Sequence, residues 1–413
     1  MTENTVLDKN TSSIIKFKDR YGKDYPEWNI IELGKLATLK NGIAKGSECF
    51  GHGKKFVNLQ DVFGKIALYN DEYELVEVTE KELSENNLLK GDVLFIRSSV
   101  KPSGVGLPCV IMEDMKDTVF SGFIIRCRFI NNIEIDINYK KYCFLEKDFR
   151  KNLLIRSSSS ANTNINQDNL SVIKVKLPCV EEQEKIASFL TSIDNLISTQ
   201  ESNISILETY NRGLISKIFK QEIRFKDANG NEFPDWEEKN LIEVCNFING
   251  KAHENAIEEK GTYIVVNSKF ISSDGTVKKY SNAQIVPLYK NDIVMVMSDV
   301  PNGKAIAKCY LIDCNNKFTL NQRICALRTN QNPYFIKMQV NRNPYYLKFD
   351  DGVKQTNLRK EDVLKCPLQL PCLEEQEKIA NFLTSLDTVL QEEKNYLEYL
   401  KTIKKGLLQQ MFV

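Results

Sequence analysis

Histidine and tryptophan are scarce in this chain of 413 residues, which has two of each. With so few imidazoles, general-base catalysis by histidine has little support. The sequence also has no run of about 18 apolar residues, so we expect no transmembrane helix. Its polar start, MTENTVLDKN, has no apolar stretch typical of a signal peptide. We therefore expect a cytoplasmic protein.

Motifs for metal and cofactor chemistry are missing as well. The eleven cysteines form no Cys-x-x-Cys pair, so we expect reduced, buried thiols and no metal site. No G-x-x-x-x-G-K-[ST] loop is present to bind ATP phosphates. Residues 332–335 (NPYF) resemble the Asn-Pro-Pro-Tyr motif of adenine methyltransferases, but they lack the second proline. These absences predict a binding protein with no catalytic residues.

An excess of one charge is also lacking. The chain has 56 Lys and Arg against 55 Asp and Glu, for a net charge of +1, which argues neither for nor against a nucleic-acid partner. The hydrophobic share of 42% and the charged share of 27% are typical of a folded globular protein. The length predicts two or three domains.

An internal repeat is the main signal that is present. Residues 177–194 read LPCVEEQEKIASFLTSID and residues 370–387 read LPCLEEQEKIANFLTSLD, identical at fifteen of eighteen positions. Two weaker echoes relate residues 17–28 to 225–236 and residues 91–95 to 291–295. The order of the three echoes is kept, which indicates a tandem duplication. We predict five segments: a tail (1–16), a globular domain (17–179), a long helix (180–222), a second globular domain (223–372) and a second long helix (373–413).

Each repeated string opens an apolar ladder with steps of three and four residues. This spacing predicts a helix with a heptad seam, and two such seams in one chain favour an antiparallel coiled coil with pseudo-twofold symmetry. Gln200 and Glu393 interrupt the seams at matching places. The predicted seam residues are Ile186, Leu190, Ile193, Ile197, Ile204 and Leu207 in the first helix, and Ile379, Leu383, Leu386, Leu390, Leu397 and Leu400 in the second.

The charge is distributed unevenly between helices and domains. Residues 181–222 carry a net −3 and residues 374–413 a net −2, which leaves +6 for the rest of the chain. Because phosphate contacts need Lys and Arg, any DNA contact should come from the globular domains.

Short β-like runs with few helical patterns predict an α+β fold for both domains. The clearest runs are Val93–Ile96, Phe123–Phe129, Tyr263–Val266, Ile293–Met297 and Ile324–Leu327. Polar and basic loops between them carry the side-chain types that read bases and bind phosphates. The candidate DNA-binding residues are Lys40, Asn41, Lys45, Arg97, Ser98, Ser99, Lys101, Ser103, Arg156, Asn162, Asn164, Asn249, Lys251, Asn267, Lys269, Ser298, Asn302, Lys304, Arg323, Lys354, Gln355, Asn357 and Arg359.

The doubled Leu-Pro-x-x-Glu-Glu-Gln-x-Lys-Ile-Ala-x-Phe-Leu string, each time closing a domain and opening a helix, resembles the specificity subunit of type I restriction–modification systems. The resemblance covers residues 17–413. It implies that each domain is a target recognition domain for one half of a bipartite, asymmetric DNA site. It also implies that the helices set the spacer.

The same resemblance implies partners and chemistry outside this chain. Two methyltransferase subunits would dock on it, and restriction subunits that translocate DNA would join them. S-adenosylmethionine, ATP and Mg²⁺ would act on those partner subunits, with no cofactor on this chain. The alternative is a coiled-coil scaffold that binds proteins and has no DNA specificity, against which the +6 confined to the domains argues only mildly.

Overall fold

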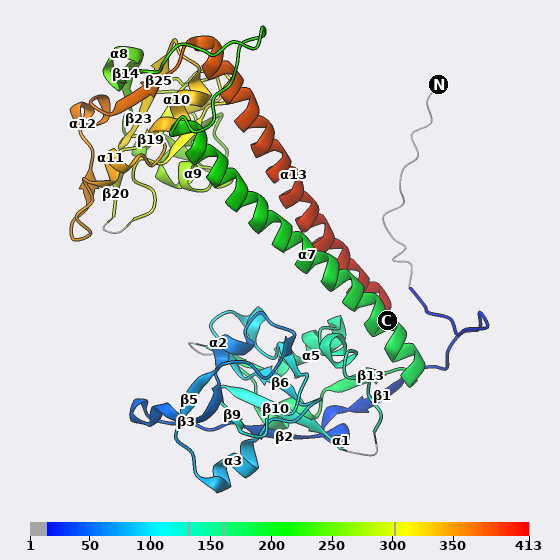
Figure 1. Cartoon of the computed structure of the whole chain (residues 1–413). Helices are drawn as coiled ribbons and strands as arrows, with labels where there is room; N and C mark the ends of the chain where they lie inside the picture. The colour runs from blue at the N-terminus through cyan, green and yellow to red at the C-terminus, as the bar shows by residue number, and fades with distance from the viewer. Residues whose placement is uncertain (1–14, 131–132, 160–161, 301–302, 413) are drawn as a thin grey trace. The chain divides into compact units, whose positions relative to one another are not determined.

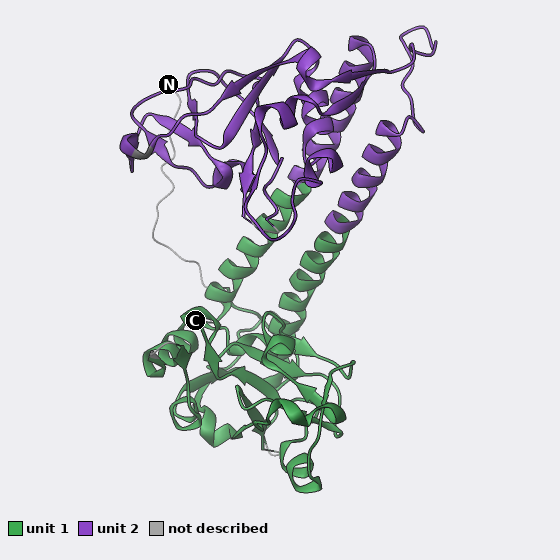
Figure 2. Cartoon of the chain, turned by 90° about the vertical axis from the view of Figure 1, so that its left-hand side faces the viewer, with its two compact units in different colours: residues 1–203, 393–413 green, residues 204–392 purple. Residues whose placement is uncertain are grey.

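The computed structural model describes residues 15–130, 133–159, 162–300 and 303–412. The chain divides into two compact units (Figures 1 and 2), unit 1 with Met1–Asn203 and Glu393–Val413, and unit 2 with Ile204–Glu392. Two long helices, α7 (Val180–Phe219) and α13 (Leu373–Met411), are shared between the units. Each unit therefore combines one globular domain with the start of one long helix and the end of the other.

Unit 1 is built on a mixed five-stranded sheet in the order β2-β10-β6-β8-β4. Its pairs are antiparallel except β4 with β8. A three-stranded sheet, β5-β3-β9, and two small sheets, β11-β12-β7 and β1-β13, complete the domain. The strands are β1 (Asn29–Glu32), β2 (Ala37–Asn41), β3 (Phe50–Val57), β4 (Ala67–Leu68), β5 (Glu74–Val76), β6 (Val93–Ile96), β7 (Ser98–Ser99), β8 (Pro108–Ile111), β9 (Thr118–Phe120), β10 (Ile124–Phe129), β11 (Ser158–Ser159), β12 (Thr163–Asn164) and β13 (Lys174–Leu177).

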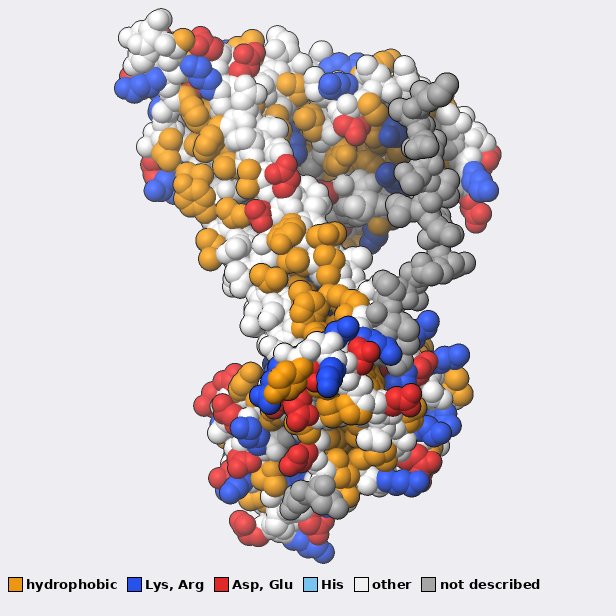
Figure 3. Space-filling model, turned by 90° about the vertical axis from the view of Figure 1, so that its right-hand side faces the viewer, with side chains coloured by type: hydrophobic (Ala, Val, Ile, Leu, Met, Phe, Trp, Pro, Cys, Tyr) orange, Lys and Arg blue, Asp and Glu red, His pale blue; other side chains and the backbone are white. Residues whose placement is uncertain are grey.

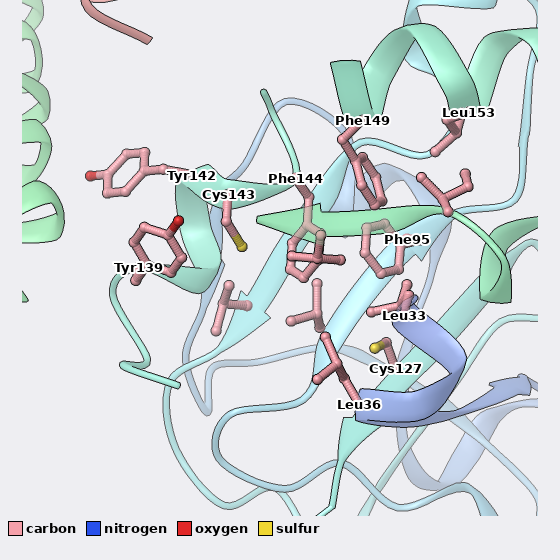
Figure 4. Packing of buried hydrophobic residues seen from close by; sticks show 14 of the residues in the cluster. Leu33, Leu36, Phe95, Cys127, Tyr139, Tyr142, Cys143, Phe144, Phe149 and Leu153 are labelled. Atoms are coloured by element: carbon pink, nitrogen blue, oxygen red, sulfur yellow. The ribbon is translucent and has the colours of Figure 1, made fainter. Parts of the chain in front are cut away.

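Short helices cover the central sheet of unit 1 and close its core (Figure 4). Phe95 on β6 lies in an aromatic cluster with Phe144 and Phe149, with ring centroids 5.0 Å apart for Phe95–Phe144 and 5.2 Å for Phe144–Phe149. Edge-to-face pairs of this kind add to the stability that burial already provides. The helices are α1 (Leu33–Leu36), α2 (Leu59–Val62), α3 (Glu80–Asn86), α4 (Lys140–Cys143), α5 (Lys147–Arg156) and α6 (Gln167–Ser171), with 3₁₀ turns at Ser47–Cys49 and Pro102–Gly104.

Unit 2 repeats this plan with a smaller central sheet, β15-β23-β19-β21. A second sheet, β16-β18-β17-β22, and two pairs, β14-β25 and β20-β24, accompany it. The strands are β14 (Glu237–Asn240), β15 (Cys245–Asn249), β16 (Ile257–Glu258), β17 (Tyr263–Val266), β18 (Tyr280–Ser281), β19 (Ile293–Val296), β20 (Ser298–Asp299), β21 (Cys309–Leu311), β22 (Phe318–Leu320), β23 (Ile324–Thr329), β24 (Thr356–Asn357) and β25 (Pro367–Leu370). The helices are α8 (Leu241–Val244), α9 (Ser268–Ser272), α10 (Pro333–Val340), α11 (Pro344–Leu347) and α12 (Lys360–Leu364), with a 3₁₀ turn at Glu254–Ala256.

The echo between residues 91–95 and 291–295 contains, in each unit, a buried aspartate that forms an ion pair with an arginine. The Asp92 carboxylate accepts from the Nε and Nη2 atoms of Arg128, at 2.8 and 2.6 Å. The Asp292 carboxylate accepts from the same two atoms of Arg328, at 2.7 and 2.8 Å. Both aspartates are buried, 2% and 1% exposed, so each bidentate pair offsets the cost of burying its charge.

The repeated Asn-Gly dipeptide at the end of β2 and of β15 has a steric reason. A Cβ atom on Gly42 would collide with the carbonyl oxygen of Phe120, and one on Gly250 with that of Asn321. Only glycine allows these two backbone segments to approach so closely. This echo therefore keeps each strand end against the turn that precedes the neighbouring strand.

The repeated Glu-Glu-Gln motif fastens each long helix to its own domain. In unit 1 the side-chain amide of Gln183 donates to the Pro178 carbonyl at 2.9 Å and accepts from the Asp136 backbone N–H at 2.9 Å. In unit 2 Gln376 donates to the Pro371 carbonyl at 2.9 Å and accepts from the Asn332 N–H at 3.1 Å. The identity of the two strings therefore has a structural cause within the chain, because both glutamines are buried.

The long helices run antiparallel within unit 1. Gln200 donates to the backbone carbonyl of Glu393 at 3.1 Å, whereas Asp194, earlier in α7, pairs with Lys404, later in α13. In unit 2 Ile218 near the end of α7 shares a core with Ile379 and Leu383 near the start of α13. All twelve predicted seam residues are buried or half-buried.

The beginning of each seam packs into a domain as well as against the other helix. Ile186 and Leu190 belong to the core of the unit 1 domain, and Ile379 and Leu383 belong to that of unit 2. The first turns of the long helices are thus core helices of the domains, and the seam continues beyond them.

Candidate nucleic-acid interface

One edge of the central sheet brings the predicted loops together in each domain. In unit 1 this edge joins residues 41–42, 97–99, 121–124 and 163–165, where β2 and β6 end and β10 begins. In unit 2 it joins residues 249–250, 297–299, 321–324 and 356–358. We call these two sets the reading edges.

The two reading edges share one backbone framework. The Arg97 N–H donates to the Phe123 carbonyl at 2.8 Å, and the Ile165 N–H donates to the Arg97 carbonyl at 3.0 Å. In unit 2 the equivalent bonds run from Met297 to Arg323 at 2.9 Å and from Leu358 to Met297 at 2.8 Å. Short strand pairs hold the same loops, β7 with β12 and β20 with β24.

Different side chains stand on this shared framework. Arg97 corresponds to Met297, Ser99 to Asp299 and Phe123 to Arg323, through the backbone bonds just described. Phe123 is 58% exposed, although phenylalanine is usually buried. The two domains therefore present different chemistry from equivalent positions, as two readers of different sequences would.

The reading edge of unit 2 contains a polar cleft of about 410 Å³. Four predicted residues line it, namely Asn267, Ser298, Arg323 and Gln355. Arg323 has a φ of +65°, which is uncommon for a residue with a side chain. Among the residues that the structure describes, its guanidinium has no hydrogen-bond or ion-pair partner, so it is free to bind a ligand.

Two other residues of this cleft already have local partners. Asn267 caps α9 by accepting from the Phe270 N–H at 2.9 Å. The Gln355 side-chain amide donates to the Ser298 hydroxyl at 2.6 Å. Such bonds orient polar side chains and leave donor and acceptor capacity unused on both amides.

The reading edge of unit 1 gathers Arg97, Ser98, Ser99 and Asn164. Arg97 donates from Nη1 to the Gly122 carbonyl at 3.1 Å, which fixes its side chain along the turn before β10. A shallow recess of about 490 Å³ lined by residues 58–60 and Phe63 lies in the same domain.

An unusual arginine on α5 contacts a loop beside this edge. Arg150 on α5 donates to the Ser103 carbonyl at 3.0 Å, while its buried Nη1 has no partner among the described residues. Burial lowers the pKa of this guanidinium. The Lys101 and Ser103 side chains of the loop are exposed.

Several predicted residues already have carboxylate partners. Lys40 pairs with Glu85 at 2.9 Å and Lys45 with Glu82 at 2.8 Å. The hydrogen bond from Lys45 lowers the pKa of Glu82 to about 2, and that to Glu82 raises the pKa of Lys45. These two lysines are therefore less available to phosphates than their sequence suggested.

The remaining predicted residues are mostly exposed. Asn41 is the last residue of β2, and Asn249 is the last residue of β15. Asn302 lies outside the described residues. Lys251, Lys269, Lys304, Lys354, Asn357, Arg359 and Asn162 are exposed, and Arg156 is half-buried at the end of α5. Their contribution to DNA binding stays a prediction.

Sequence reasoning missed Phe123, Asn321 and Gln322, which also lie on the reading edges. A signal for them existed, because the offset of 200 that relates residues 91–95 to 291–295 also aligns 120–124 with 320–324. Extending that echo would have paired Phe123 with Arg323.

The described residues show no group of three or more His, Cys, Asp or Glu that could hold a metal ion. The eleven cysteines are all free. His253 is buried, and its ring nitrogens bond to the Lys251 carbonyl and the Thr319 hydroxyl, at 2.8 and 2.9 Å. Among the helices that the structure describes, none is long and apolar enough to span a membrane.

A family model for the type I restriction modification DNA specificity domain matches residues 25–208 and again residues 234–401. The chain belongs to this family. The prediction from the repeat is confirmed: the chain is a type I specificity subunit with two target recognition domains that provide DNA sequence specificity. The prediction that it is not itself an enzyme is also confirmed, since catalysis in these systems resides in the modification and restriction subunits.

Similar proteins match this specificity subunit over nearly its full length. The MjaVIII specificity subunit of Methanocaldococcus jannaschii is 24% identical and aligns with 95% of this chain and 94% of its own. The crystal structure of the S subunit from M. genitalium has a TM-score of 0.53 at 16% identity, and covers 97% of this chain and 99% of its own. A chain from a study of complex assembly and conformational transition in the type I R-M system has a TM-score of 0.59 at 14% identity, and covers 93% of this chain and 97% of its own.

These likenesses confirm the predicted fold of two mixed α/β domains with two long helices packed against each other. Because the family is non-catalytic, no cofactor is expected on this chain. Type I systems act as complexes on DNA, and the family therefore implies partner subunits for this chain.

Proposed function

We propose that each target recognition domain reads one half of a bipartite, asymmetric DNA site through its reading edge. The observation that carries this proposal is the shared backbone framework with different side chains at equivalent positions. A common framework would place both edges in the same way on a DNA groove. Arginine suits guanine and an exposed aromatic ring suits a thymine methyl group or an unstacked base, so the halves should differ in sequence.

The long helices support the rest of the proposal, which concerns spacing and docking. Their exposed apolar residues (Figure 3) are numerous for helices facing water. In unit 1 they include Phe189, Leu196, Tyr396 and Tyr399, and in unit 2 Ile206, Tyr210 and Val389. We infer that methyltransferase subunits dock on these surfaces and that the helices set the spacer between the half-sites.

The partner subunits would supply the chemistry in this proposal. S-adenosylmethionine would serve methyl transfer to adenine on the methyltransferase subunits, and ATP and Mg²⁺ would serve the restriction subunits. The complex would act on DNA in the cytoplasm, where the eleven free cysteines of this chain stay reduced.

The test is to change the free arginine of unit 2 and map N6-methyladenine across the host genome. Arg323→Ala should relax one base pair in one half of the methylated motif, since a bidentate arginine–guanine contact discriminates by about 1–3 kcal/mol. Lys290→Ala is the matched control, because Lys290 is exposed in the same domain and precedes β19, whereas the reading edge follows β19. A motif altered in both halves, or unaltered by Arg323→Ala, would contradict the proposal.

A further inference from the structure

The second glutamate of the repeated Glu-Glu-Gln motif is held differently in the two units. In unit 2 Glu375 accepts a fork of two bonds from Arg224, from Nε at 3.0 Å and from Nη2 at 2.9 Å. The same Nη2 donates to the Pro234 carbonyl at 2.7 Å and to the Phe233 carbonyl at 3.2 Å. The indole N–H of Trp236 completes the site by donating to Glu375 at 3.1 Å.

Unit 1 contains every part of this site except the arginine. Trp28 donates to Glu182 at 2.9 Å, as Trp236 does to Glu375. Tyr25 and Pro26 stand where unit 2 has Phe233 and Pro234, and Lys16 stands where it has Arg224. Lys16 is exposed, and within the described part of the chain it forms no ion pair with Glu182.

A cavity of about 480 Å³ lies at this position in unit 1. The counterparts of the Arg224 site all line it, namely Lys16, Tyr25, Pro26, Glu27, Trp28 and Glu182. Glu182 is only 5% exposed, and Lys16 acts on its carboxylate only at a distance, without an ion pair. Burial raises the pKa of Glu182 by more than the Trp28 hydrogen bond and the charge of Lys16 lower it.

We propose that this cavity of unit 1 is a binding site for a guanidinium group supplied from outside the described chain. The planar fork of a guanidinium matches a carboxylate in two parallel bonds and has further N–H groups for the two carbonyls. A lysine ammonium is a single point charge and cannot reproduce that fork. Unit 2 shows the geometry of the occupied site, with its own arginine as the ligand.

Two sources can present this chemistry, an arginine side chain of a partner protein or a free small guanidinium compound. Residues 1–14 contain no arginine, so that segment cannot supply the group. The inference goes beyond DNA recognition and does not depend on which bases the reading edges contact.

The two tryptophans make a direct measurement possible, because one lies at each site. The full-length chain labelled with 5-fluorotryptophan should give one ¹⁹F signal from Trp28 and one from Trp236, assigned with Trp236→Phe. We expect N-acetyl-arginine methylamide to shift the Trp28 signal alone, at a concentration at least tenfold lower than N-acetyl-lysine methylamide. Equal responses to the two probes, no response, or equal shifts of both signals would overturn the proposal.

Two variants give independent checks on the site. Glu182→Gln retains the acceptor for Trp28 but removes the charge, so it should weaken binding of the arginine probe at least tenfold. Lys16→Arg should fill the cavity from within, shift the Trp28 signal without any probe, raise the melting temperature and abolish binding. An unchanged affinity in both variants would show that the probe binds elsewhere.

The source follows from assembly with the methyltransferase subunit. If a partner supplies the arginine, Lys16→Arg should reduce copurification of that subunit at least severalfold, whereas Lys16→Gln should not. If Lys16→Arg leaves assembly intact while it blocks the probe, a free guanidinium compound is the ligand. An unchanged methylation motif in Lys16→Arg would separate this site from base recognition.

Discussion

At the scale of single residues, the repeated positions of this chain mostly maintain structure, and the positions that differ carry specificity. Asp92 and Asp292 are buried and bound to arginines, and the repeated glutamines fasten the long helices to their domains. Phe123 and Arg323 differ although their backbones are equivalent. A duplicated chain diverges where divergence changes what is bound and stays alike where a buried polar group needs its partner.

The Asp292–Arg328 pair of unit 2 gives the first prediction. Asp292→Ala should lower the free energy of unfolding by about 1–3 kcal/mol, because it leaves the Tyr289 N–H without its acceptor, whereas Arg328 is 43% exposed and stays hydrated. Urea unfolding followed by circular dichroism measures this. Asp313→Ala, an exposed neighbour in the same unit, should change stability by no more than about 0.5 kcal/mol. Equal effects of the two variants would contradict the role assigned to Asp292.

The Lys45–Glu82 pair predicts a dependence on pH. The Glu82 pKa is lowered from 4.5 to about 2, first by the hydrogen bond from Lys45. A carboxylate with a lowered pKa stabilises the fold above its unfolded value and loses that contribution as the pH falls through its folded value. Glu82→Gln should therefore lower the urea midpoint at pH 7, and its difference from wild type should shrink between about pH 4.5 and pH 2. Glu80→Gln is the control. A difference between Glu82→Gln and wild type that stays constant with pH would argue against the pair.

At the scale of elements, two glycines differ in the space that a side chain would find at their positions. Gly213 lies inside α7, and a Cβ atom there would meet nothing within 4 Å in the described structure. Gly250 ends its strand against Asn321, where a Cβ atom has no space. The same residue type thus has opposite consequences in a helix and at a reading edge.

These glycines predict stability changes of opposite sign. Gly213→Ala should raise the free energy of unfolding by about 0.5–1 kcal/mol, because alanine loses less backbone entropy in a helix. Gly250→Ala should lower it and disturb the reading edge, because the Asn321 carbonyl must move away. Thermal melting of the isolated chain compares them. A stabilising Gly250→Ala would show that the turn before β23 is not rigid.

Elements formed by local patterns were predictable, and those formed by distant pairing were not. The apolar runs at residues 93–96 and 293–297 were predicted as strands, and the structure has strand β6 at Val93–Ile96 and strand β19 at Ile293–Val296. The two-residue strands β7 and β12 have no pattern of their own, since they exist only through pairing, β7 with β12 and β12 also with β11. The composition of the loops was enough to predict them as candidates. The backbone hydrogen bond between Arg97 and Phe123 joins distant parts of the chain, so it could not be predicted. The charge of Lys45 was visible in sequence, but its partner Glu82, on α3, was not.

At the scale of the whole molecule, the duplication gives both units the same set of structural elements. Each unit has one recognition domain, the start of one long helix and the end of the other. Both domains join their helix through the same Leu-Pro sequence and the same glutamine bonds. A domain should therefore function in either unit, since its connections to the helices are alike.

Exchange of a domain tests this directly. Replacing residues 225–372 with a second copy of residues 17–179 should give a chain with two identical reading edges. If each edge reads one half-site, this chain should direct methylation to a site in which both halves have the sequence now read by unit 1, in inverted orientation. Mapping of N6-methyladenine in a host that carries the exchanged chain measures the outcome. A methylated motif that retains the half-site of unit 2 would refute the assignment of one half to each domain, because the residues proposed to read that half would be gone.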